Sequence, residues 1–329
     1  MATDDASGRR PTDLFGVGLV IASAFCYSTL SIFGKVAFAL HLPLLPLLAT
    51  RFALGVVILW IWVLAAAESR QAVARVPRAR VLGLLAWGAV GFSGQSVLFF
   101  LALERIPASL TELLLYTCPA FLALMLWAMT RRRPRGSRLA AIALALLGTW
   151  LCVGPIHGVV DARGAALATL SGCWYAAFLI WMDRLTPGIP GAVSSAYIIT
   201  GAALAFGTAS LIRGGGFLVP HGARAWGSVL GIVLSATVFG LVLFVAGLKR
   251  VGPQVTSVLS TFEPLGTLLL AAIFLGERLD GLQWIGAALI IGAAFVLAST
   301  SGEGDSMGPA DAPLPAIPEA GVKSPGARA

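Results

Sequence analysis

The sequence predicts an all-α polytopic membrane protein in which ten transmembrane helices form two inverted five-helix repeats. Three observations lead to this fold class. The composition is 58% hydrophobic and only 12% charged, the chain contains ten long apolar segments, and its two halves resemble each other. With 329 residues the chain is long enough for ten spans, because each span needs about 20 residues.

The composition excludes several classes of protein. An ordinary soluble domain is about a quarter charged, whereas this chain is 12% charged with a mean hydropathy of +0.89. It has too few charges to be a soluble enzyme, a nucleic-acid-binding protein or a secreted module held by disulfides. Its net charge of +8 suits the anionic inner face of a membrane. The cysteines lie in apolar stretches without a CxxC pair, which favours buried thiols over a disulfide or metal site: Cys26, Cys118, Cys152 and Cys173.

Charged residues and Pro or Gly clusters divide the chain into ten apolar segments, which in lipid satisfy their own backbone only as helices. The first repeat, 14–153, contains 14–34, 44–66, 80–102, 108–130 and 137–153. The second repeat, 163–299, contains 163–182, 191–212, 224–248, 253–275 and 281–299. Residues 1–13 are expected to form a polar cytoplasmic tail before an uncleaved first span. Residues 300–329, with five of the 18 prolines, are expected to form a disordered cytoplasmic tail.

The distribution of Lys and Arg predicts the orientation, because cytoplasmic loops carry the excess of these residues. With ten spans both termini lie on one side. Before the C-terminal tail that side has 14 cations: Arg9, Arg10, Arg70, Arg75, Arg78, Arg80, Arg131, Arg132, Arg133, Arg135, Arg138, Arg184, Lys249 and Arg250. The opposite side has six: Lys35, Arg105, Arg163, Arg213, Arg224 and Arg278. We therefore expect a multi-pass protein of a bacterial-type inner membrane with both termini in the cytoplasm.

The two halves are related by two similar shifts in sequence number. A shift of 145 aligns 97–120 with 242–265, with identities at Val97, Leu98, Phe99, Leu103, Arg105, Thr111 and Pro119. A shift of 148 aligns the first and sixth spans, with identities at Gly16, Leu19, Ser23, Tyr27 and Ile32. Because each half has an odd number of spans, the second half inserts upside down. Inverted repeats are a construction of secondary transporters, whose substrate site lies near the midplane between the halves.

Two segments also resemble a known family. Residues 264–297, PLGTLLLAAIFLGERLDGLQWIGAALIIGAAFVL, resemble the closing signature of the EamA-type drug/metabolite transporters. Pro46 followed by Arg51-Phe52 resembles the family's signature in the first half. The likeness extends over about 14–299, and it implies a ten-helix inner-membrane carrier, most like the YddG-type aromatic amino acid exporters. The position that corresponds to Glu277 in the first half is Arg132, so no symmetric role is expected for that Glu.

Three charged residues fall well inside the predicted spans, where an ionised side chain costs a few kcal/mol or more. Arg51 lies roughly 10 Å and Glu112 roughly 6 Å from the outer ends of their spans, at 1.5 Å per residue. These depths allow them to form an ion pair that locks two helices. A gate or a contact to a charged substrate is the alternative.

Glu263 is the third intramembrane charge and lies roughly 15 Å deep, near the midplane, without a basic residue at that depth. A carboxyl in such a place is favoured in its neutral form, so it could bind a substrate ammonium group or carry a proton. The alternative is a structural Glu beside a Pro kink.

Pro119 and Pro264 occupy equivalent mid-span positions and are hinge candidates. Each lacks an N–H, which frees the carbonyl four residues earlier, on Leu115 and Ser260. Interrupted helices at corresponding positions of two repeats are a sequence indication of a transport site. Ordinary kinks are equally compatible with these prolines.

Aromatic and hydroxyl side chains at mid-depth suggest a cavity for neutral amino acids with apolar or aromatic side chains. The candidate rings are Tyr27, Tyr116, Trp174 and Tyr175, and the candidate polar groups are Ser93, Gln95, Thr237 and Ser260. Core packing of the rings and hydrogen bonding between helices are the alternatives.

The expected function is the export of amino acids by alternating access, with the direction of transport implied by the resemblance. The sequence lacks the GxxxxGK[ST], HExxH and GxSxG motifs, so we expect no enzyme, cofactor or metal. We expect amino acids and the lipid bilayer as partners, no nucleic acid, and function as a monomer. Export of drugs or amphipathic cations, and a membrane enzyme acting on lipid, are the alternatives.

Overall fold

The computed structural model describes residues 14–131, 136–153, 161–260 and 262–300, and the regular elements in these ranges are helices. The first half contains α1 (Leu14–Ala39), α2 (Leu44–Ala65), α3 (Ala67–Arg75), α4 (Arg78–Trp87), the π-helix η1 (Gly88–Phe92), α5 (Ser93–Arg105), α6 (Ala108–Leu115), α7 (Cys118–Thr130) and α8 (Gly136–Val153). The second half contains α9 (Ala162–Leu185), α10 (Gly191–Ile212), α11 (Ala223–Gly231), the π-helix η3 (Ile232–Phe239), α12 (Gly240–Leu259), α13 (Phe262–Phe274) and α14 (Gly281–Thr300). Residues 1–13 and 301–329, which belong to the two predicted tails, lie outside the described residues, as does Arg132.

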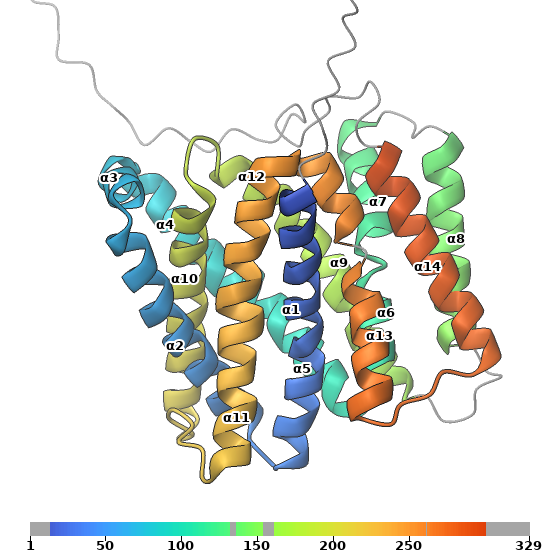
Figure 1. Ribbon diagram of the computed structural model, residues 1–329, viewed down its shortest axis with the longest axis horizontal. Coiled ribbons are helices and arrows are strands. Elements are labelled where there is room, and N and C mark those ends of the chain that lie inside the picture. The colour runs from blue at the N-terminus through green and yellow to red at the C-terminus, as the bar shows by residue number, and fades with distance from the viewer. Residues whose placement is uncertain (1–13, 132–135, 154–160, 261, 301–329) are drawn as a thin grey trace, which may run out of the picture.

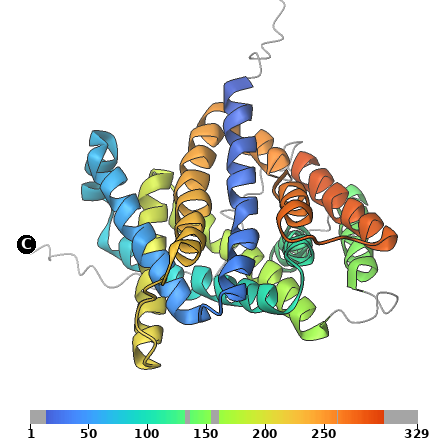
Figure 2. The same cartoon turned by 60° about the horizontal axis from the view of Figure 1, so that its bottom comes forward.

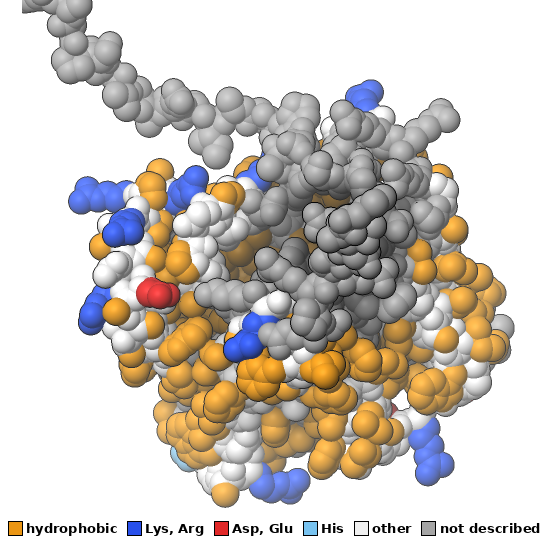
Figure 3. Space-filling model, turned by 45° about the horizontal axis from the view of Figure 1, so that its top comes forward, with side chains coloured by type: hydrophobic (Ala, Val, Ile, Leu, Met, Phe, Trp, Pro, Cys, Tyr) orange, Lys and Arg blue, Asp and Glu red, His pale blue; other side chains and the backbone are white. Residues whose placement is uncertain are grey.

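Within the described ranges, seven helical stretches are long and apolar enough to cross a membrane: Leu14–Ala39, Leu44–Ala65, Arg78–Arg105, Ala108–Met129, Ala162–Met182, Gly191–Ile212 and Ala223–Phe244. Phe262–Phe274 and Gly281–Ala293 are apolar but shorter. Large apolar side chains such as Leu82, Ile212 and Phe274 are 67%, 80% and 69% exposed. Figure 3 shows a mainly hydrophobic surface between ends fringed with Lys and Arg. An apolar exterior of this extent fits a multi-pass membrane protein, while the number of ten spans stays a prediction.

Three features differ from the predicted segments. The short helix α3 lies between the second and third segments, with Glu68 in its first turn and Arg75 in its last, which suits the helix dipole. π-Helices interrupt the third and eighth segments, as η1 and η3. The segments predicted as single helices over 108–130 and 253–275 are both divided: α6 ends at Leu115 before α7 begins at Cys118, and α12 continues to Leu259 before α13 begins at Phe262.

The helices pack in pairs that are related by exchange of the two halves. Helix α1 packs against α12 and α13, while its counterpart α9 packs against α5, α6 and α7, which correspond to α12 and α13 by the shift of 145. Helix α2 packs against its counterpart α10, and α8 packs against its counterpart α14. Figures 1 and 2 show α1 beside α12 and α14 beside α8 from two directions. In Figure 1 the start of α1 and the end of α14 lie at the same end of the bundle.

Small residues allow the same close contact in both halves. A Cβ on Gly16 of α1 would lie 2.7 Å from a side-chain carbon of Val251. A Cβ on Gly164 of α9 would lie 2.6 Å from a side-chain carbon of Ile106. Gly16 and Gly164 are related by the shift of 148, and Ile106 and Val251 by the shift of 145. Glycine at both positions therefore lets equivalent helices approach closely.

Two serine hydroxyls repeat this relation. Ser23 of α1 donates to the carbonyl oxygen of Gly240 at 2.7 Å, and Ser171 of α9 donates to that of Gln95 at 3.2 Å. The Gln95 amide also donates to the Ser171 hydroxyl at 3.4 Å. Gln95 thus connects α5 to α9 directly beyond η1, as Gly240 connects α12 to α1 directly beyond η3.

An ion pair joins the end of α5 to the start of α9. The side chain of Asp161 accepts the backbone N–H of Arg163 at 2.8 Å and therefore caps α9. The Arg105 guanidinium lies 3.3 Å from Asp161 Oδ2. The backbone N–H of Arg163, followed by the Arg105 side chain, holds the pKa of the Asp161 carboxyl below its usual value. Both groups are partly exposed, so the pair positions a loop more than it stabilises the core.

Gly88→Ala and Gly201→Ala are each expected to lower the midpoint of thermal unfolding in detergent. A Cβ on Gly88 would overlap the carbonyl oxygen of Ile198, and one on Gly201 that of Leu85. Such overpacking typically costs about 1–3 kcal/mol. Gly227→Ala is the matched control, because a Cβ there meets nothing within 4 Å. Midpoints for the first two variants equal to that of Gly227→Ala would contradict the close approach of η1 and α4 to α10.

Candidate functional site

Two helix breaks lie at equivalent positions of the two halves. Helix α6 ends at Leu115, and α7 begins with Pro119 in its first turn. Helix α12 ends at Leu259, and Pro264 is the third residue of α13. The sequence predicted kinks within continuous helices, but each proline instead lies at the start of a new helix. Proline is tolerated there because the N–H groups in the first turn of a helix have no acceptor within the helix. A hinge role for the two prolines stays a prediction.

Tyr116 joins the two breaks. Its hydroxyl lies 2.8 Å from the carbonyl oxygen of Ser260 and 2.8 Å from Glu263 Oε2. The Ser260 carbonyl is the one that Pro264 was expected to free. A tyrosine hydroxyl has one hydrogen, so Tyr116 donates to one of these two oxygens at a time. The Glu263 side chain is partly accessible.

Helix α1 holds α13 at the second break. The Ser28 hydroxyl lies 2.7 Å from the carbonyl oxygen of Glu263, to which it donates, and the Thr267 hydroxyl donates to the Ser28 carbonyl at 3.4 Å. Sequence reasoning missed Ser28. The available signal was the spacing of Ser23, Ser28 and Ser31 along α1, all of which are fully buried.

Arg51 and Glu112, the predicted ion pair, do not pair in this structure. Arg51 is 5% exposed, and its Nε donates to the Thr237 hydroxyl of η3 at 3.3 Å. Glu112 is 3% exposed, and its Oε2 accepts the Ser31 hydroxyl of α1 at 3.1 Å. The expectation was wrong because similar depth does not give the same direction, and the two side chains turn to different helices.

Aromatic rings, in place of a carboxylate, surround the Arg51 guanidinium. Its central carbon lies 4.8 Å from the ring centre of Phe52 and 5.6 Å from that of Phe100. Cation–π contacts of this kind stabilise a desolvated cation without neutralising it. Within the ranges that the structure describes, Arg51 has no acidic side chain at ion-pair distance.

Two of the predicted polar and aromatic residues bind carbonyls of η1. The Ser93 hydroxyl donates to the Gly88 carbonyl at 3.2 Å. The Trp174 indole of α9 donates to the Gly91 carbonyl at 2.8 Å. A π-helix alters the usual hydrogen-bond pattern, and these side chains bind the backbone there. In this structure Trp174 joins α9 to η1, which was the alternative to substrate binding, whereas Ser93 bonds within its own helical stretch.

The remaining rings pack against helices on either side. The Tyr175 and Phe178 rings of α9 stack with centres 6.1 Å apart at 15°. The ring of Tyr27 lies against α12, where a Cβ on Gly240 would be 3.2 Å from its Cζ. Of the four predicted rings, Tyr116 is the one that binds the acidic group at the helix breaks.

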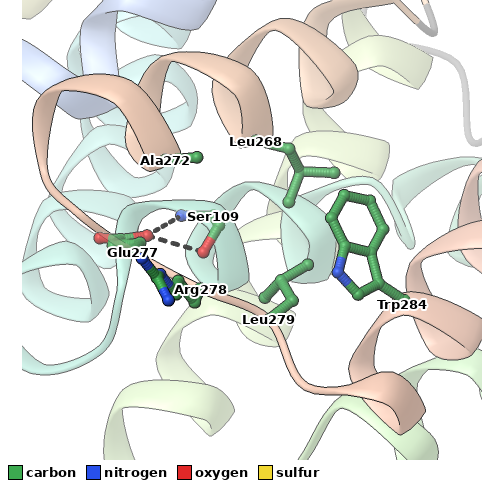
Figure 4. A pocket seen from close by; sticks show the side chains of 7 residues that line it. All are labelled: Ser109, Leu268, Ala272, Glu277, Arg278, Leu279 and Trp284. Carbon is green, nitrogen blue, oxygen red and sulfur yellow. Dashed lines mark hydrogen bonds between the residues drawn. The ribbon is translucent and has the colours of Figure 1, made fainter.

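A pocket of about 260 Å³ lies at another place, where the loop between α13 and α14 meets α6. Figure 4 shows its lining: Ser109, Leu268, Ala272, Glu277, Arg278, Leu279 and Trp284. The predicted binding residues are not part of this lining. The pocket is thus separate from the cluster at the helix breaks.

Glu277 caps α6 from this loop. Its Oε1 accepts the backbone N–H of Ala108 at 2.7 Å, and its Oε2 accepts the backbone N–H and the hydroxyl of Ser109 at 3.0 and 2.7 Å. A carboxylate at a helix N-terminus satisfies free N–H groups and interacts well with the helix dipole. The sequence contained this Glu within the signature, but it gave no indication of the partner helix.

Comparison with known proteins identifies the family. The EamA-like transporter family matches residues 14–154 and 162–299, so the chain belongs to this family. The uncharacterized transporter YcbK of Bacillus subtilis is 27% identical over 294 residues, which are 86% of this chain and 91% of that protein. The threonine/homoserine exporter RhtA of Escherichia coli K12 is 28% identical over 224 residues, which are 67% of this chain and 72% of that protein.

A crystal structure also matches, with a TM-score of 0.60 and 20% identity over 88% of this chain and 99% of that one. This likeness bears on the fold alone. Members of the family are transporters and not enzymes. The particular similarity to YddG-type exporters stays a prediction.

Glu277→Ala is expected to lower the stability of the folded protein by about 1–2 kcal/mol, because three hydrogen bonds to the start of α6 are lost. Thermal unfolding in detergent measures this loss, with Arg278→Ala as the control, since that side chain is exposed and adjacent. If the two variants unfold at the same temperature, Glu277 does not support α6.

Proposed function

We propose that this EamA-like transporter exports neutral amino acids across a bacterial inner membrane by alternating access. The observation that carries the proposal is the junction of the two helix breaks through Tyr116, Ser260 and Glu263. Broken helices that meet from two halves offer backbone carbonyls and a carboxyl to a solute at mid-depth. The named activity of RhtA, a threonine/homoserine exporter, supports the substrate class.

The proposed architecture is ten spans in two inverted repeats, 14–153 and 163–299, acting as a monomer with both termini in the cytoplasm. The exchange-related packing of α1 with α12 and of α9 with α5 supports the repeat. The equivalent hydrogen bonds of Ser23 and Ser171 support it as well. The excess of Arg at the end of the bundle where the chain enters α1 supports the orientation.

In the proposed cycle a substrate enters from the cytoplasm and binds between the halves. Its ammonium group contacts the ionised form of Glu263 and the Ser260 carbonyl, and in doing so it replaces the Tyr116 hydroxyl. The phenol ring of Tyr116, with Tyr27 and Tyr175 on the neighbouring helices, accepts apolar or aromatic side chains. Movement of the halves about the breaks at Pro119 and Pro264 then opens the site outward.

Arg51 is the proposed counter-ion for the substrate carboxylate on the outward path. Its guanidinium is buried and has rings and a hydroxyl as neighbours, so an arriving carboxylate gains a charge-assisted hydrogen bond without displacing a protein carboxylate. This role replaces the ion pair with Glu112. In this proposal Arg51 acts as a gate by binding the substrate carboxylate, so the two alternative roles of Arg51 are one.

Export of drugs or amphipathic cations is the second candidate. The feature that favours it is Glu263, a carboxyl held by a tyrosine in an apolar bundle. An organic cation would need Glu263 but not Arg51, so the two candidates differ in their dependence on Arg51.

Purified protein in liposomes is expected to exchange neutral amino acids, and a panel including phenylalanine, leucine, threonine and homoserine measures this activity. Glu263→Gln and Tyr116→Phe are expected to lower the flux about tenfold, the effect of losing one charged hydrogen bond. Ser93→Ala is the control, because its hydroxyl bonds within its own helical stretch. Absence of flux for the whole panel would overturn the amino acid proposal, and dye efflux in its place would favour the second candidate.

Arg51→Gln is expected to lower phenylalanine flux about tenfold and to leave the flux of phenylalanine amide, which lacks the carboxylate, nearly unchanged. Arg213→Gln, at an exposed position after α10, is the control. Equal loss for both solutes would show that Arg51 supports the structure and does not recognise the carboxylate.

A further inference from the structure

Glu112 is a buried acid that the proposed transport path does not use. It lies on α6, its side chain is 3% exposed, and its Oε2 accepts the Ser31 hydroxyl at 3.1 Å. Its Oε1 is sealed from solvent and has no hydrogen-bond donor among the described groups. A solute therefore cannot reach this carboxyl, in contrast to the partly accessible Glu263.

The ionisable groups that face Glu112 are themselves acidic. They are Glu263 on α13 and Tyr116 at the end of its own helix. On α1, the acidic groups whose charges act on Lys35 are Glu277 and Glu104, and Glu112 is not among them. Glu112 therefore lacks a described cation that would compensate a negative charge.

The other helices packed against α6 do not change this balance. At the end of α5, Arg105 pairs with Asp161. On α9, Tyr175 is near Cys118 and Glu263. Helix α14 contains no ionisable residue between Gly281 and Thr300, and α8 contains Arg138 and Cys152 near its two ends.

An ionised Glu112 would be a buried charge with one oxygen entirely unpaired, which costs several kcal/mol. With a proton on Oε2 the carboxyl instead donates to the Ser31 hydroxyl, and Oε1 is a neutral carbonyl oxygen, whose missing partner costs much less. The geometry therefore requires a neutral Glu112 in this conformation.

We propose that Glu112 is a proton-binding site that couples amino acid export to proton entry. This inference rests on the proposed function. In this proposal Glu263 binds the substrate ammonium group, whereas Glu112 binds the transported proton. In each cycle the O–H bond of Glu112 breaks and its proton passes to water on the cytoplasmic side, and a proton from outside restores the acid. The exchange is therefore one proton inward for one amino acid outward, without oxidation or reduction.

Tyr116 gives the two sites a physical connection. Its backbone N–H donates to the carbonyl of Glu112 at 3.0 Å, and its hydroxyl contacts Glu263. A substrate that displaces this hydroxyl releases the end of α6 from α13. That release opens the seal around Glu112 and admits water to its proton.

The test is amino acid transport in liposomes with and without a pH gradient. In the wild type, one unit of gradient is expected to drive about tenfold accumulation, the value for one proton per substrate. Glu112→Gln is expected to retain exchange of amino acids without a gradient and to lose the gradient-driven accumulation, with a ratio of about one. Glu112→Asp restores an acid and is expected to recover coupling, and Glu104→Gln, at an exposed position, is the control.

Ser31→Ala provides a second variant if Glu112→Gln does not fold. It removes the acceptor of the Glu112 proton in this conformation, so the midpoint of the pH dependence of transport is expected to move downward by about one unit. Coupled accumulation that persists in Glu112→Gln, or an unchanged midpoint in Ser31→Ala, overturns the inference. The inference is also overturned if wild-type transport does not depend on the pH gradient. Absence of all amino acid exchange instead overturns the proposed function itself.

Discussion

The whole arrangement depends on how the polar backbone groups at the two helix breaks are satisfied inside an apolar bundle. In lipid a carbonyl that has lost its helical partner must find another donor within the protein. At the second break the Ser260 carbonyl accepts the backbone N–H of Glu263 and the hydroxyl of Tyr116, which comes from the first break. The Tyr116 side chain at the first break thus binds the backbone of the second break. The same hydroxyl holds the Glu263 carboxyl where the two halves meet.

Sequence periodicity predicted the helical class, most of the span positions and the equivalence of the halves, because these follow from hydrophobic segments and identities at fixed shifts. It predicted a free Ser260 carbonyl, but that carbonyl accepts the backbone N–H of Glu263 at 3.0 Å as well as the Tyr116 hydroxyl. It did not predict that α13 would start anew before Pro264, or that Arg51 and Glu112 would face different helices. The direction of a side chain depends on helix rotation, and η1 and η3 alter that rotation in ways that composition does not indicate. The partner of Glu277 was equally inaccessible, because a cap joins elements about 170 residues apart and has no local signal.

Charged groups have different interaction partners at the ends of the bundle and in its middle. At the ends, Arg105 pairs with Asp161 and Glu277 caps α6, so these charges hold loops in place. In the middle, Arg51 is surrounded by rings and Glu112 by acidic or neutral neighbours. Buried ionisable groups without an ion-pair partner lower stability, and their concentration in the middle leaves the centre easier to rearrange than the loops at the two ends.

The π-helices also determine which residues face the interior of the bundle. A π turn takes in an extra residue, so everything beyond it is rotated by about 100° relative to an uninterrupted α-helix. Gln95 faces Ser171 directly after η1, and Gly240 faces Ser23 directly after η3. A helical wheel drawn straight through either span assigns the wrong face to its second half. Deletion of one residue within η1 or η3 would therefore turn the inner surface of that half toward lipid, even if every hydrophobic residue were kept.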